Sequence, residues 1–323
     1  MFFLFLSGRI GNLCAELPFD RLYLDSKIPI PFGASSAAQL AAHASARMRS
    51  RLITIALLAG SLAAAHGCMS LGARETTDAI RRQNDAAAYM AHPTTIGQLV
   101  LHADFVLPPE HRMLTELVAE RELICEQLKI PPSKEPIHVH LFAEEASYRQ
   151  HVSRKFPGFP ERRAIFVETD VELSVYAHWG EAIAEDLRHE VAHGYLHASV
   201  PNIPLWLDEG LAEFFEVGRG RRGVNRMHVD YLNGQLAIGG WRPNLPRLEQ
   251  LTTAADMKQL EYAESWLWVH FLLSSQDGKA DVLTDYLAAL RTGEPVAPLS
   301  ERVNAVLAQP APALIEHLKS LSQ

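Results

Sequence analysis

The stretch RHEVAHGYLH, residues 188–197, decides how the rest of this chain is interpreted. Its two histidines, His189 and His193, stand four residues apart, so on a helix they lie one turn apart on the same face. Both imidazoles can then bind one metal ion. Glu190 would stand beside that ion without binding it, in the place of a general base that acts on water activated by the metal. The spacing predicts a metal site on a helix, and such a site needs a third ligand.

The third ligand is predicted in the stretch PLWLDEGLAEFFE, residues 204–216. Glu209 follows His193 after fifteen intervening residues. The helix-breaking stretch PNIP, residues 201–204, lies between them, so a second helix can fold back antiparallel to the first. HEVAH followed by WLDEGLAE resembles the gluzincin metallopeptidases, the superfamily of thermolysin and the M1 aminopeptidases. It is most similar to the peptidase MA-like branch of small secreted or lipid-anchored bacterial proteins.

The resemblance implies a zinc metallopeptidase that hydrolyses peptide bonds in peptide or protein substrates. His189, His193 and Glu209 would bind Zn²⁺, and Glu190 would be the general base. Two further hypotheses stay open at this point. One is a lipid-anchored binding or scaffold protein that keeps the gluzincin fold without turnover, and the other is a zinc hydrolase that acts on a non-peptide amide.

Acidic residues next to Glu209 are expected to support the histidines. By the resemblance, Glu213 supports the first histidine and Asp208 the second, because a histidine that binds a metal usually donates its other N–H to a carboxylate or carbonyl. His197 is surplus to this pattern, and we interpret it as a helix-end or surface histidine.

The chemistry also needs a donor for the oxyanion and a surface for the peptide. Members of the family use a tyrosine or histidine from the helical half as the donor. Tyr262 is the first candidate here, with Tyr231 and His228 as alternatives. An extended peptide would add to a sheet edge, and by the resemblance the strand ELSVYAH, residues 172–178, is that edge.

Hydrophobic periodicity predicts an α+β fold with a small mixed or antiparallel sheet in the N-terminal half and a mainly helical C-terminal half. Alternating residues predict strands in four stretches, the last two as a hairpin, and apolar residues three and four apart predict helices before, between and after them. The predicted strands are 98–105, 137–142, 163–169 and 172–178. The predicted helices are 108–130, 144–152, 181–200, 205–218, 246–252, 262–275, 279–293 and 299–309.

The N-terminal residues read as a targeting segment. From Met48, two arginines precede an apolar stretch and then Cys68, which is typical of an export signal. The protein is therefore expected to be exported, either as a lipoprotein anchored at Cys68 or as a periplasmic or secreted protein cleaved after Ala65. The predicted organisation is a signal or targeting segment at 1–67, with translation starting at Met48 or residues 1–47 forming an extension. A tether at 68–97 and a single metallopeptidase-like domain at 98–323 follow, with the domain divided into an α/β sublobe at 98–198 and a helical sublobe at 199–323.

Composition sets the outer limits of function. With 48% hydrophobic and 21% charged residues in 323, the chain is typical of a globular protein. A net charge of −8 and the lack of basic runs interleaved with aromatics argue against nucleic acid as a partner. Three cysteines, of which Cys125 alone lies inside the predicted domain, offer no disulfide framework.

Overall fold

The computed structural model describes residues 93–274 and 279–322. The predicted targeting segment at 1–67, Cys68 and the tether up to residue 92 lie outside the described residues. Within the described part, no helix is long and apolar enough to cross a membrane.

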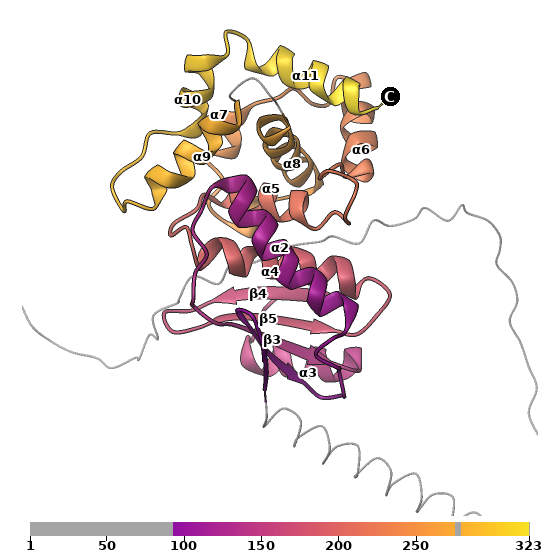
Figure 1. The fold of residues 1–323 in the computed structure, drawn as a ribbon. Helices are drawn as coiled ribbons and strands as arrows, with labels where there is room; N and C mark the ends of the chain where they lie inside the picture. The colour runs from indigo at the N-terminus through magenta and orange to yellow at the C-terminus, as the bar shows by residue number, and fades with distance from the viewer. Residues whose placement is uncertain (1–92, 275–278, 323) are drawn as a thin grey trace, which may run out of the picture.

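A mixed β-sheet forms the base of the N-terminal half (Figure 1). Among the described residues its strand order is β1-β2-β3-β5-β4, with β2, β3 and β5 parallel to one another and with β1 and β4 antiparallel to their neighbours. The strands are β1 (Thr94–Ile96), β2 (Leu99–Ala103), β3 (Ile137–Phe142), β4 (Ala164–Glu168) and β5 (Leu173–His178).

Helices cover both faces of this sheet. α2 (Arg112–Leu128) and α4 (Ile183–His197) lie on one face, and α3 (Glu145–Lys155) packs on the other (Figure 1). Alternation along the strands explains the two layers, because alternate residues point to opposite faces. Residues such as Val139 and Val175 join the core under α4, whereas Ile165 and Tyr176 join a smaller cluster under α3.

The C-terminal half is helical and is arranged around α8 (Gln259–Leu273) (Figure 1). Almost every residue of α8 is buried, because helices surround it and leave it no polar outer face. α5 (Leu205–Phe215) packs against both α8 and α4, and so joins the two halves. The remaining helices are α6 (Arg226–Ala237), α7 (Leu245–Leu248), the short 3₁₀ helix η1 (Ala254–Asp256), α9 (Lys279–Leu290), α10 (Leu299–Val306) and α11 (Pro310–Leu321).

Two glycines let helices approach their neighbours closely. A Cβ atom on Gly194 of α4 would lie 3.0 Å from the side chain of Ile137 in β3. A Cβ atom on Gly210 of α5 would lie 2.7 Å from the backbone oxygen of Ser265 in α8. These close approaches set the position of α4 on the sheet and of α5 on α8.

The predicted α+β class, with the sheet first and the helices second, is confirmed. Three local predictions are wrong. The expected edge strand, β5, lies between β3 and β4, and β4 is the edge strand next to α4. β1 lies in the predicted tether, where it pairs with β2. Helices α6 and α11 form where no helix was predicted, because their apolar stripes pack against α8.

Candidate metal centre

α4 carries three polar side chains into the protein interior. His189 and His193 are fully buried and Glu190 is 3% exposed. The ring centroids of the two histidines lie 5.0 Å apart, as expected for positions one helical turn apart. The helix is buried around these residues because the sheet covers one side of it and α2 and α5 cover others.

α5 brings Glu209 to the same point. The turn between the two helices contains Asn202 with a φ of 54°, a left-handed conformation that asparagine tolerates well. Glu209 is fully buried, and its Oε2 lies 3.7 Å from Nε2 of His189 and 3.6 Å from Nε2 of His193.

The three side chains have a spacing that fits one metal ion. Their ligand atoms all lie within 4.8 Å of one another. Ligands of a tetrahedral zinc ion at about 2.0–2.1 Å would be roughly 3.3 Å apart, slightly less than the 3.6 and 3.7 Å found here. This buried group of two histidines and a glutamate could hold a metal ion.

The other nitrogen of each imidazole faces a second carboxylate. Nδ1 of His189 is hydrogen-bonded to Oε2 of Glu216 at 2.8 Å, and Nδ1 of His193 lies 2.7 Å from Oδ2 of Asp208. With Nδ1 occupied in this way, both Nε2 atoms are left on the side of Glu209.

Glu213 is not the partner of His189 that the resemblance implied. It accepts a hydrogen bond from Nε2 of His228 at 2.8 Å, while Glu216, three residues further along, contacts His189. Asn225 donates to both carboxylates and holds them side by side. Glu216 was not among the predicted site residues, although its seven-residue spacing from Glu209, two helical turns, placed it on the same face.

His197 is the last residue of α4, as expected of a helix-end histidine, but its side chain is only 6% exposed. It bridges two carboxylates, with Nδ1 2.7 Å from Glu168 and Nε2 3.1 Å from Asp208. Burial lowers the pKa of His197, but these carboxylates outweigh that effect and raise the pKa to about 9. Burial by itself raises the pKa of the Asp208 carboxyl, but His193 and His197 outweigh it and hold that pKa well below its usual range. His197 therefore belongs to the charge network of the site, and its interpretation as a surface residue is wrong.

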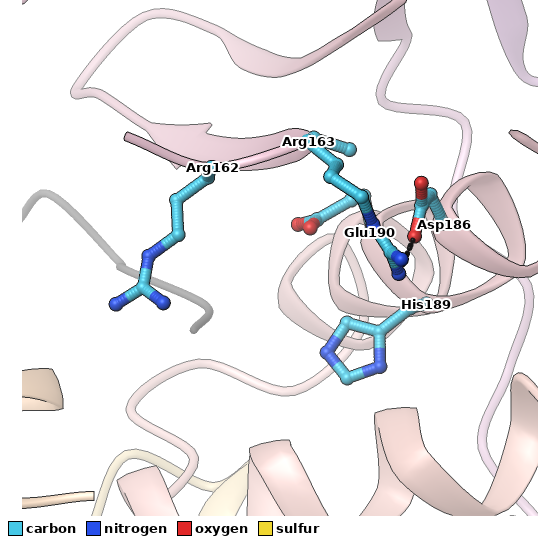
Figure 2. Close-up of a pocket in the computed structure, with 6 residues that line it drawn as sticks. Arg162, Arg163, Asp186, His189 and Glu190 are labelled. Atoms are coloured by element: carbon cyan, nitrogen blue, oxygen red, sulfur yellow. Dashed lines mark hydrogen bonds and ion pairs between the residues drawn. The ribbon is translucent and has the colours of Figure 1, made fainter. Parts of the chain in front are cut away.

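A small hollow, with room for about one water molecule, lies beside the general-base candidate (Figure 2). It lies between the part of α4 that carries His189 and Glu190 and the start of the edge strand β4. Its lining residues are Arg162, Arg163, Ala164, Asp186, His189 and Glu190.

The candidate oxyanion donors lie in different places. Tyr262 is in the first turn of α8 and 4% exposed, and Tyr231 lies on α6. His228 is engaged with Glu213. The assignment of Tyr262 as donor stays a prediction.

A tyrosine that the sequence did not single out lies close enough to the general-base candidate to be affected by its charge. Tyr148 on α3 is buried, and burial, followed by the charges of Glu190 and Asp186, raises its pKa. No motif marks this residue in the sequence, because α3 is brought to the site by its packing on β3 and β5.

No family model matches the chain, and no curated protein matches it either.

Proposed function

We propose that this protein is a zinc-dependent peptidase. The observation that carries the proposal is the convergence of His189, His193 and Glu209 on one buried point, with Glu190 beside them at a small hollow. A structural metal site would more often be closed and rich in cysteine, whereas two histidines, a carboxylate and an adjoining opening are typical of a catalytic site.

The donor set suits zinc. Two imidazole nitrogens and one carboxylate oxygen leave a fourth position open, which a catalytic zinc ion uses for water or substrate. When bound, zinc would supply Lewis-acid chemistry, lowering the pKa of a water molecule and polarising the carbonyl of the scissile bond. Glu216 and Asp208 would fix the orientation of the two histidine rings.

The protein's own residues would then carry the proton transfers. Glu190 takes a proton from the attacking water as the water oxygen bonds to the carbonyl carbon. It then gives that proton to the amine nitrogen as the peptide bond breaks. An extended peptide would pair with β4, since β4 is the edge strand beside α4 and Ala164 at its start lines the hollow next to Glu190.

The metal part of the proposal is tested by the zinc content of the purified full chain, measured by elemental mass spectrometry. We expect about one zinc per chain in the wild type and in Glu126→Gln, an exposed change on α2 that serves as the control. Glu209→Gln should bind zinc much more weakly. Equal zinc content in all three proteins, or none in the wild type, would refute the site.

The catalytic part is tested with Glu190→Gln. This variant should keep its zinc and lose hydrolysis of a peptide library, because the amide cannot accept the proton of water. Hydrolysis that survives in Glu190→Gln would refute the mechanism. Zinc binding with no hydrolysis by the wild type would instead favour the non-enzymatic alternative, a binding protein with this fold.

A further inference from the structure

The hollow beside Glu190 holds two arginines with different surroundings. Arg163 turns towards Asp186, and its Nη2 lies 2.7 Å from that carboxylate, so its charge is balanced within the protein (Figure 2). Arg162 lies two residues before β4 and extends on the other side of Glu190 (Figure 2). The two side chains therefore diverge around the general-base candidate.

The charge of Arg162 is not balanced in this way. The side chain is half-buried, and its Nε atom is buried without a hydrogen-bond partner. No ion pair joins Arg162 to any residue in 93–274 or 279–322. A buried N–H that lacks an acceptor is unfavourable, so an anionic ligand that supplied an acceptor would gain binding free energy.

The position of Arg162 along the edge strand indicates what that ligand is. Moving along β4, Ala164 adjoins Glu190, Phe166 stacks on His193 with ring centroids 5.8 Å apart, and Glu168 contacts His197. β4 and α4 thus run side by side in the same direction. Arg162 comes just before the strand and so lies beyond the Glu190 end of the site.

We propose that Arg162 forms a subsite for a peptide carboxylate, so that preferred substrates carry an acidic side chain or their own C-terminal carboxylate close to the scissile bond. The inference rests on the proposed peptidase function and names its substrate class. The single guanidinium of a half-buried arginine suits one carboxylate, which it can bind through two parallel N–H···O bonds.

The two possible sources of the carboxylate differ in what they require of the peptide. A peptide that pairs antiparallel with β4 runs from the Glu168 end towards Arg162, and so presents its C-terminal residues to the guanidinium. A parallel peptide would present its N-terminal ammonium there, which Arg162 repels. A C-terminal carboxylate therefore requires antiparallel pairing, whereas an acidic side chain is compatible with either direction.

Binding is measured first, in the full chain loaded with zinc and carrying Glu190→Gln, by calorimetry. The probes are hexapeptides of one neutral sequence: one amidated, one with a free C-terminus, and an amidated set with Glu at each position in turn. We expect at least one carboxylate probe to bind about 10- to 100-fold more tightly than the neutral amide. The probe that gains affinity identifies the source of the carboxylate.

Arg162→Gln should abolish this gain, and Arg162→Lys, which keeps the charge but not the planar fork, should keep part of it. Arg112→Gln is the matched control, because the Arg112 side chain is 90% exposed on α2, and it should keep the whole gain. A gain that survives in Arg162→Gln, or equal binding of all probes, would overturn the proposal.

Hydrolysis by the wild-type chain separates this inference from the function on which it rests. Cleavage of neutral and carboxylate peptides at equal rates would leave the peptidase proposal standing and overturn the role of Arg162. Tight binding of carboxylate probes that depends on Arg162, with no cleavage of any peptide, would support the role of Arg162 and overturn the peptidase proposal. If both hold, Arg162→Gln lowers kcat/KM only for the carboxylate substrates, by the same factor as it weakens binding.

Discussion

Replacing Gly210 by alanine should destabilise the protein and disturb the residue beside it, Glu209. Alanine usually stabilises a helix by about 0.5–1 kcal/mol relative to glycine. Here its Cβ would lie 2.7 Å from the carbonyl oxygen of Ser265, and 2.8 Å from the carbonyl carbon. Both are backbone atoms inside the buried helix α8, so they cannot rotate away as a side chain could, and α5 has to move.

The size of the effect follows from these two opposing terms. Overpacking of this kind typically costs about 1–3 kcal/mol, which outweighs the gain in helix propensity. Gly234→Ala is the matched control, because Gly234 also lies inside a helix, is exposed, and has no atom within 4 Å of its would-be Cβ. It should be more stable than the wild type by about 0.5–1 kcal/mol. We therefore expect the two variants to differ by roughly 2 kcal/mol.

Urea unfolding of the full chain, followed by circular dichroism, measures this difference as a shift of about 1 M between the two midpoints. The zinc affinity of the folded variants is the second measurement, since a shift of α5 carries Glu209 away from the two histidines. The reasoning is refuted if Gly210→Ala unfolds at the same urea concentration as Gly234→Ala or a higher one.

Three further outcomes are expected. Glu216→Gln should weaken zinc binding roughly tenfold, measured by competition with a chelator, since it removes the charge that orients the first histidine. Nδ1 of His270 lies 2.9 Å from Nε2 of His317. Burial lowers the pKa of each histidine to about 4, and the neighbouring charge adds to this effect, that of His317 on His270 and that of Lys279 on His317. The pKa values in the folded protein lie below the unfolded value of 6.5, so the stability that these histidines contribute above pH 6.5 is lost as the pH falls towards 4. His317→Leu should reduce this loss, which is measured as the change of the urea midpoint between pH 6.5 and pH 4. Arg247→Met should cost about 2–3 kcal/mol in the same assay, because it leaves the fully buried carboxylate of Glu264 without its cation, and an unchanged midpoint would contradict this.

The helix that carries His189 and His193 could be predicted from sequence because the pattern that indicates it is local. The four-residue spacing of His189 and His193 has one consequence on any α-helix, whatever surrounds it. The second helix could also be predicted from local sequence, because the helix-breaking stretch PNIP and the run of apolar residues after it set its bounds to within a few residues of those of α5. The approach of Glu209 to the histidines was inferred from a resemblance, and the distances of 3.6 and 3.7 Å come from the packing of α5 on α4.

The partners of the histidines could not be predicted in the same way. Glu213 and Glu216 lie one turn apart on one helix, and the choice between them depends on the position of α5 relative to α4 and α6. His197 looked surplus because its partner Glu168 is far away in sequence and meets it only through the packing of β4 on α4.

By itself, the sequence determined the α+β class, most of the helices and the placement of His189 and His193 on one helix face, since each of these follows from spacing along one segment. Tertiary structure alone decided that β4, not β5, is the edge strand, and that Arg162 stands at the hollow beside Glu190. The physical reason is that strand order and side-chain neighbours depend on which distant segments bury one another, and that is settled by the packing of the whole core.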